Sequence, residues 1–108
     1  MATIRLKTNE ITDWTTFHSV CKQAMGFPDF YGNNMNAWID CLTYLDEDDQ
    51  MTKFTLAENE RLEIEISETI QFKTQTPEIY DALITCSAFV NQRYLEQGKQ
   101  PKLSLIFL

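Results

Sequence analysis

Residues 61–67, RLEIEIS, restrict the fold most strongly, because apolar and polar side chains alternate along them without exception. A period of two is typical of a strand with one face in the core and the other towards solvent. Residues 3–7 repeat this pattern, and residues 102–108, KLSLIFL, predict a buried strand at the end of the sequence. The segments between these strands have helical spacing, and helical crossovers join parallel strands. We therefore predict an α/β fold with a small, three-stranded, mainly parallel sheet covered by helices.

Two helices are predicted between the first and second strands. Asp13 is a suitable N-cap for the first helix, and Gly26, followed by Phe-Pro, is a suitable end. The second helix is expected to begin after Asn33 or Asn34, because apolar residues then recur every three or four positions. These apolar residues are Met35, Trp38, Leu42 and Leu45. Residues 46–60 show no clear period, so we expect a loop or a short helix there.

A longer helix is predicted between the second and third strands. Pro77 is typical of a first helical turn, Thr76 precedes it as a candidate cap, and an apolar stripe continues to near Gly98. The stripe consists of Ile79, Leu83, Cys86, Val90 and Tyr94. A chain of 108 residues, of which 44% are hydrophobic, has the size of one domain with one core. We therefore expect a single domain over residues 1–108.

The chain is acidic, with 16 aspartates and glutamates against 9 lysines and arginines, and a net charge of −7. This charge disfavours binding to nucleic acid or to an anionic membrane and favours a basic partner. It is equally consistent with a role in solubility alone. The first residues, MATIRLKTNE, contain no apolar signal region, and no apolar run approaches the ~20 residues that span a bilayer. We therefore expect a cytoplasmic protein.

Sequence patterns for metal and cofactor sites are absent. The three cysteines lie far apart and none belongs to a CxxC pair, which argues against a zinc site or a disulfide framework. After the acidic run DEDD, Met51 and Ala57 stand where a calcium-binding EF-hand loop requires glycine and glutamate. Glycine-rich phosphate-binding motifs are also absent. We expect neither a metal nor a cofactor.

One pair of residues allows an enzymatic alternative, because His18, the only histidine, lies three positions before Cys21 on the first predicted helix. A thiol beside an imidazole can act as a nucleophile. However, Cys21 lies on the apolar side of that helix, and no third catalytic group is evident. A buried cysteine beside a surface histidine is therefore favoured over a small hydrolase.

The second predicted helix carries the clearest candidate binding surface. Asn36, Asp40 and Thr43 lie on the side opposite its apolar stripe, and Ile39 flanks them. Residues 24–51 contain no lysine or arginine, whereas six acidic residues occur there. A desolvated charge surrounded by apolar side chains is a common basis of an interface hot spot. The alternative interpretation is a solvated helix face without a partner.

Residues 27–43, FPDFYGNNMNAWIDCLT, resemble the hallmark segment of the barstar family, LPxYYGxNxxALWDCLT. The predicted order of strands and helices is also similar to that of the family. The resemblance implies a small intracellular inhibitor, or immunity-type protein, and not an enzyme. Its target would be a basic, barnase-like microbial ribonuclease, whose RNA-cleaving site the second helix and the preceding loop would block, with Asp40 in a phosphate subsite. The residues expected to bind this partner are Phe30, Asn34, Asn36, Ile39, Asp40, Thr43 and Tyr44.

The chain departs from the family pattern at several positions. Asn36 replaces an acidic residue one turn before the key aspartate, and Tyr44 replaces a small glycine. The order Trp38-Ile39 replaces Leu-Trp, so we expect Ile39 in place of a contact tryptophan. The acidic residues that the family carries on its later helix have no clear counterpart near residues 91–93. These departures leave open an alternative, a barstar-fold protein that binds a partner other than a ribonuclease.

Overall fold

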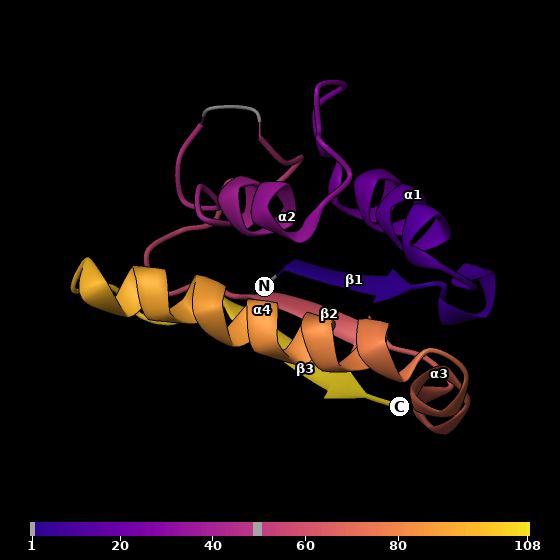
Figure 1. The fold of residues 1–108 in the computed structure, drawn as a ribbon. Helices are drawn as coiled ribbons and strands as arrows, with labels where there is room; N and C mark the ends of the chain where they lie inside the picture. Colours follow the sequence, from indigo (N-terminus) through magenta and orange to yellow (C-terminus); the bar gives the residue numbers. More distant parts are fainter. Residues whose placement is uncertain (1, 49–50) are drawn as a thin grey trace.

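In the computed structural model, which describes residues 2–48 and 51–108, three strands form one sheet. They are β1 (Ala2–Leu6), β2 (Leu62–Ile66) and β3 (Leu103–Phe107). The strands lie in the order β1-β2-β3, and both neighbouring pairs are parallel (Figure 1). The prediction of an α/β fold with a small, three-stranded, mainly parallel sheet is confirmed.

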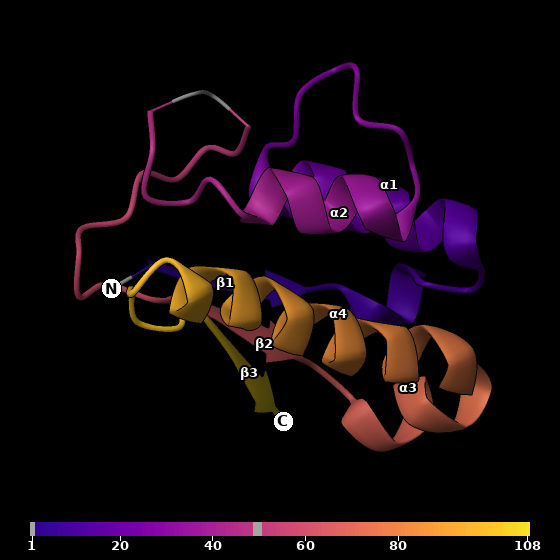
Figure 2. The same ribbon diagram turned by 60° about the vertical axis from the view of Figure 1, so that its left-hand side comes forward.

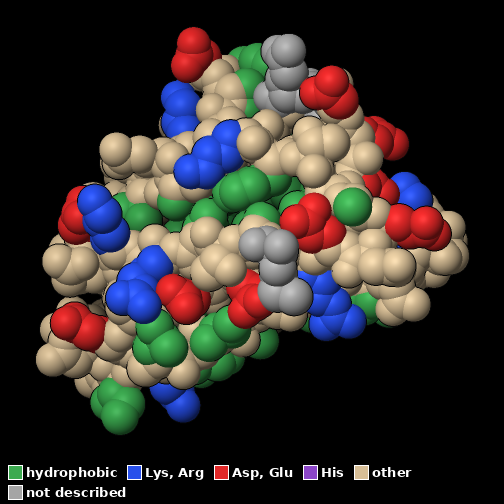
Figure 3. Space-filling view, turned by 180° about the vertical axis from the view of Figure 1, so that it is seen from behind, with side chains coloured by type: hydrophobic (Ala, Val, Ile, Leu, Met, Phe, Trp, Pro, Cys, Tyr) green, Lys and Arg blue, Asp and Glu red, His purple; other side chains and the backbone are tan. Residues whose placement is uncertain are grey.

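The two faces of the sheet differ as the alternation predicts. Ile4 and Ile64 pair in register and are buried. Arg5 and Glu65 form the next pair and point to the opposite face, where Arg5 Nε lies 3.2 Å from Glu65 Oε1. On the side of the molecule seen in Figure 3, basic and acidic side chains are interspersed with apolar ones. Because an exposed ion pair contributes only ~0–1 kcal/mol, burial of the isoleucines fixes the register more strongly than the charges do.

The first helix, α1 (Trp14–Met25), begins and ends where the sequence predicts. The Asp13 carboxylate accepts a hydrogen bond from Thr16 N at 2.8 Å, and Thr16 Oγ1 accepts one from Asp13 N at 3.0 Å. This reciprocal cap holds the pKa of Asp13 below its usual value. At the other end Gly26 has a φ of +71°, and a Cβ there would lie 2.8 Å from Cβ of Lys53. Glycine is therefore required by both the backbone conformation and the available space.

The other two predicted helices are α2 (Met35–Leu42) and α4 (Pro77–Glu96). α2 begins after Asn34, which is one of the two predicted starts. Thr76 precedes α4 but does not cap it with its side chain, because its hydroxyl donates to Phe72 O at 3.0 Å instead. α1 packs on β1, α4 packs on β3, and α2 packs against α4 (Figures 1 and 2).

Two short elements are missing from the sequence prediction, η1 (Thr8–Glu10) and α3 (Thr69–Gln75). α3 buries only Phe72, and its other large apolar residue, Ile70, is 82% exposed. Because α3 has no apolar stripe, its residues carry no helical signal. The segment 46–60 forms a loop at all of its described positions, and positions 49 and 50 lie outside the described residues.

The last strand is less buried than predicted. Leu103 is buried, but the strand becomes more exposed towards its end, and Phe107 is 45% exposed. The reason is that β3 lies at the edge of the sheet. A continuous apolar run does not distinguish an edge strand from a central one, and the prediction of a buried strand was wrong on this point.

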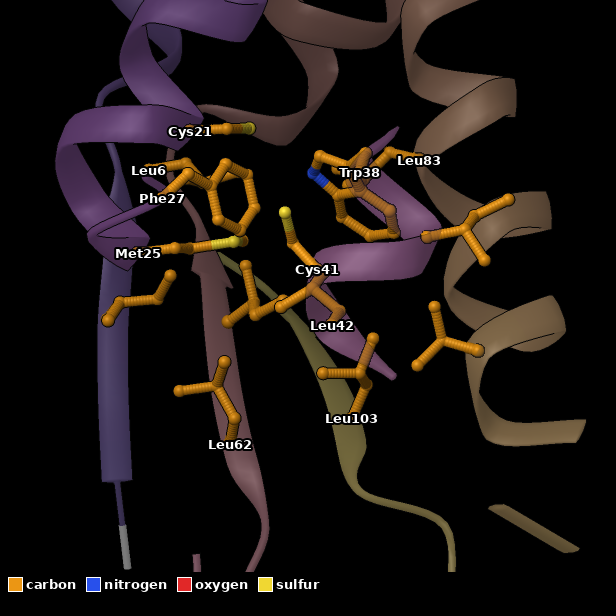
Figure 4. Packing of buried hydrophobic residues seen from close by; sticks show 14 of the residues in the cluster. Leu6, Cys21, Met25, Phe27, Trp38, Cys41, Leu42, Leu62, Leu83 and Leu103 are labelled. Carbon is orange, nitrogen blue, oxygen red and sulfur yellow. The ribbon is translucent and has the colours of Figure 1, made fainter. Parts of the chain in front are cut away.

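One buried cluster joins the sheet to the helices and fixes the position of α2 (Figure 4). Trp38 of α2 is fully buried, and its ring lies beside Leu83 of α4. The Tyr94 hydroxyl donates to Leu42 O at 2.7 Å and accepts from Leu45 N at 2.9 Å. These contacts tie the end of α2 to α4, so the outward face of α2 has a defined position in the molecule.

Candidate functional site

The loop before α2 is anchored by one aromatic side chain and presents another to solvent. Tyr31 is buried, and its hydroxyl lies 2.6 Å from His18 Nδ1. Tyr31 N donates to Pro28 O at 2.9 Å, which closes a turn. The neighbouring Phe30 is 76% exposed. Phe30 thus has the exposure that a partner contact requires, and its role in binding stays a prediction.

Asn34 holds the start of α2. Its side-chain oxygen accepts a hydrogen bond from Ala37 N at 2.8 Å, and its amide nitrogen donates to Gly32 O at 3.2 Å. The cap therefore joins the first turn of the helix to the loop before it. The predicted contact of Asn34 with a partner stays a prediction.

The outward face of α2 is exposed as the helical spacing predicts. Asn36 is exposed, and the Asp40 side chain is 60% exposed. Tyr44, just after the helix, is 40% exposed. Thr43 is half-buried, and its hydroxyl donates to Ile39 O at 2.7 Å. This surface offers a carboxylate, an amide and an aromatic ring, which are groups suited to recognition of another molecule.

Ile39 does not lie on this exposed face, contrary to prediction. It is 9% exposed and belongs to the buried cluster. The physical reason is its spacing, because Ile39 lies four positions after Met35 and three before Leu42, at the edge of the apolar stripe. Trp38 is also fully buried, so α2 directs both of these large apolar side chains towards the interior. A direct contact between Ile39 and a partner is not supported by this burial.

Asp40 has a cationic neighbour, contrary to the expectation of a face without cations. Arg93 of α4 donates from Nη1 to Asp40 Oδ1 at 2.9 Å and to Thr43 Oγ1 at 3.2 Å. The Arg93 guanidinium also lies 5.4 Å from the centre of the Phe89 ring. The expectation rested on the absence of lysine and arginine from residues 24–51, whereas Arg93 lies 53 positions beyond Asp40.

Arg93 and Phe89 are therefore surface residues that the sequence reasoning missed. The sequence does indicate which side of α4 they occupy. Val90 and Tyr94 belong to the apolar stripe and lie in the core, so positions 89 and 93, each one residue earlier, lie at the edge of that stripe. That spacing gives the side of α4 on which they lie. It does not reveal that this side meets α2, which depends on the packing of the two helices.

Part of the acidic run after α2 is also paired. Lys99 Nζ lies 2.8 Å from Asp46 Oδ2, and the Asp46 side chain is only 13% exposed. Glu47 and Asp48 are exposed. Asp49, the last acid of the run, lies outside the described residues. Together with the pair between Arg93 and Asp40, this means that two of the six acidic residues in positions 24–51 are paired with a cation from α4 or from the segment after it.

His18 and Cys21 do not form a nucleophilic pair. We expected a surface histidine, but His18 is only 4% exposed. Its Nδ1 is hydrogen-bonded to the Tyr31 hydroxyl, and the Trp14 ring stacks on it with 5.9 Å between the ring centroids. Burial lowers the pKa of His18 and raises the pKa of the Cys21 thiol to about 12. A neutral imidazole and a protonated thiol are therefore favoured at neutral pH, which opposes nucleophilic catalysis.

Within the described ranges, no cluster of three or more histidine, cysteine, aspartate or glutamate side chains is arranged to hold a metal ion. None of the helices in this part of the chain combines the length and the apolar character needed to cross a bilayer. The surface formed by Phe30, Asn36, Asp40, Thr43 and Tyr44 remains the best-supported candidate site.

Comparison with known protein families gives a match over nearly the whole chain. The family model for barstar, described as a barnase inhibitor, matches residues 1–106. A search among curated proteins finds no match. The matched range includes the loop, α2 and α4, and it confirms the resemblance that residues 27–43 carry.

Proposed function

The chain belongs to the barstar family, and we propose that it binds and inhibits a basic ribonuclease in the bacterial cytoplasm. The family is one of barnase inhibitors, which are binding proteins and not enzymes. We assign the binding to the outward face of α2 and to the loop before it. The observation that carries this proposal is the position of Asp40, a 60% exposed carboxylate on a helix whose opposite face is fixed in the core.

An exposed carboxylate can occupy the place of an RNA phosphate. Ribonucleases bind phosphate through positively charged donors, and these also bind carboxylates. The Asp40 carboxylate offers negative charge and acceptor oxygens but no phosphodiester bond to cleave. Packing of Trp38 and the hydrogen bonds of Tyr94 already hold α2 in place, so binding requires little further ordering of the helix. The net charge of −7 accelerates the approach to a basic protein.

Two exposed aromatic residues supply apolar area beside this charge. Phe30 is 76% exposed on the loop, and Tyr44 is 40% exposed after α2. Apolar contacts around a charged group exclude water and strengthen its interactions. Asn34, Asn36 and Thr43 provide polar groups on the same segment. We therefore assign the partner contacts to these residues together with Asp40.

A barstar-fold protein that binds a partner other than a ribonuclease is the second candidate. The ion pair between Asp40 and Arg93 favours it, because the guanidinium lowers the net negative charge of the α2 face. Asn36 reduces that charge further, since it stands where an acid is expected from the family pattern.

RNA cleavage in the presence of the purified chain tests the proposal. Barnase and other basic microbial ribonucleases, including any encoded beside the gene of this chain, are assayed with increasing amounts of the protein. We expect at least one ribonuclease to lose activity in proportion to the amount added. Undiminished cleavage by every member of the set at saturating concentration rejects the proposal. Recovery of a partner without nuclease activity in a pull-down then supports the second candidate.

A further inference from the structure

Arg93 is held over the outward face of α2 by contacts on several sides. It donates to Asp40 Oδ1 at 2.9 Å and to Thr43 Oγ1 at 3.2 Å, and its guanidinium lies over the Phe89 ring at 5.4 Å. Both ends of the ion pair are still accessible, because the Arg93 side chain is 37% exposed and that of Asp40 is 60% exposed. The guanidinium is therefore part of the candidate surface.

The position of Arg93 changes what Asp40 offers to a partner. A cation that approaches Asp40 also meets the guanidinium bonded to it, and like charges at this range repel each other. A partner site that carries only basic groups must therefore displace Arg93 from Asp40, Thr43 and Phe89, or lose binding free energy to this repulsion. A site that carries a carboxylate opposite Arg93 and a cation opposite Asp40 leaves every charge paired. Charge complementarity of this kind selects one partner over another.

A second ion pair near the end of α4 provides an internal reference. Lys99 pairs with Asp46 at 2.8 Å, and its side chain is 37% exposed, as is that of Arg93. Asp46, however, is 13% exposed, whereas Asp40 is 60% exposed. The two cations thus have the same charge and exposure, but only Arg93 masks an acid that is open to a partner.

We propose that Arg93 is a specificity-determining residue of the partner surface. The natural partner presents a carboxylate to Arg93, next to a basic group that binds Asp40, and packs apolar atoms on Phe89, which is 52% exposed. This inference rests on the proposed function of the α2 face. Its consequence is that a ribonuclease with only basic groups opposite this surface binds weakly.

Calorimetric titration with barnase as the probe tests the masking of Asp40. Arg93→Gln and Lys99→Gln each remove one positive charge from an ion pair, so they change the net charge equally. We expect Arg93→Gln to bind barnase at least about tenfold more tightly than the unchanged chain does. Lys99→Gln should change the affinity less than about threefold. Arg93→Lys keeps the charge and should bind like the unchanged chain.

The same titration with a double variant tests whether the gain acts through Asp40. In the Asp40→Asn background the gain from Arg93→Gln should be smaller, because no carboxylate is unmasked and only the repulsion between the guanidinium and the cations of barnase is relieved. Barnase variants in which single basic side chains of its surface are replaced by glutamate test the partner's side. One of them should bind the unchanged chain more tightly than barnase itself does, and Arg93→Gln should remove that preference.

Two outcomes overturn this inference. One is an Arg93→Gln affinity that does not exceed that of Lys99→Gln, and the other is a gain that is undiminished in the absence of the Asp40 carboxylate. If barnase binds the unchanged chain and Arg93→Gln with equal affinity and is inhibited by both, the inference fails while the proposed function stands. If neither protein binds any ribonuclease of the set, both fail. Thermal unfolding of each variant verifies that it is folded before binding is compared.

Discussion

The inward and outward side chains of residues 27–44 have opposite surroundings, although they alternate along one short segment. Tyr31 and Trp38 are buried among the aromatic and aliphatic residues of the core. Phe30 and Asp40 are exposed. The inward residues determine where the outward ones are placed, and the outward ones determine what the surface can bind. Substitutions on the two sides should therefore affect different measurements.

The largest effect on folding is expected from the inward side. Trp38→Ala removes a fully buried ring from between α2 and α4. We expect the free energy of unfolding, measured by urea denaturation, to fall by about 3–5 kcal/mol. A loss below about 1 kcal/mol would show that the buried side chains of α2 do not hold the helix in place. The inward residues would then not determine the position of the outward ones.

The largest effect on binding is expected from the outward side. Asp40→Ala removes an exposed carboxylate and a surface ion pair, so the free energy of unfolding should change by less than about 1 kcal/mol. The affinity for an inhibited ribonuclease should fall at least about thirtyfold, because a desolvated charge of the partner loses its counter-charge.

Glu63→Ala is the matched control for this loss. Glu63 lies on β2, one position from the buried Ile64, and its side chain points to the other face of the sheet. The substitution removes the same charge, and the affinity should change less than about threefold. Equal losses in the two variants would mean that only the overall charge matters.

A smaller effect, on the pH dependence of stability, is expected from His18, which is hydrogen-bonded to Tyr31 in the loop before α2. Burial lowers the pKa of His18 below its value of 6.5 in an exposed chain, so the folded state favours the neutral ring. The contribution of His18 to stability is therefore complete above pH 6.5 and is lost as the pH falls towards the lowered pKa of the folded state.

Urea denaturation between about pH 7.5 and about pH 5.5 measures this dependence. In His18→Gln the part of the slope that belongs to His18 should disappear, and no second histidine is present to replace it. An identical slope in the variant would contradict the assignment of His18 as a buried, neutral partner of Tyr31.

The features that could be predicted from the sequence are those that nearby residues determine. Asp13 and Gly26 mark the two ends of α1, and Asn34 marks the start of α2, because caps and left-handed residues act on the turn next to them. Strict alternation along residues 61–67 likewise predicts β2. The outward position of Asp40 belongs to the same class, because it follows from the helical spacing of α2.

The features that could not be predicted depend on contacts between distant segments. The pairing of Asp40 with Arg93 spans 53 positions and exists only because α2 packs against α4. The burial of Ile39 depends on how far the core covers the edge of the apolar stripe. The exposure of Phe107 depends on the edge position of β3.

The central claim, that a partner docks on the outward face of α2, is tested most directly by NMR titration of the labelled chain with an inhibited ribonuclease. We predict that the largest changes in amide chemical shift occur in residues 27–44 and around positions 89–93. The amides of residues 3–5 and 61–65 should change little. Largest changes in β1 and β2, with the amide shifts of α2 unchanged, would contradict docking on this face.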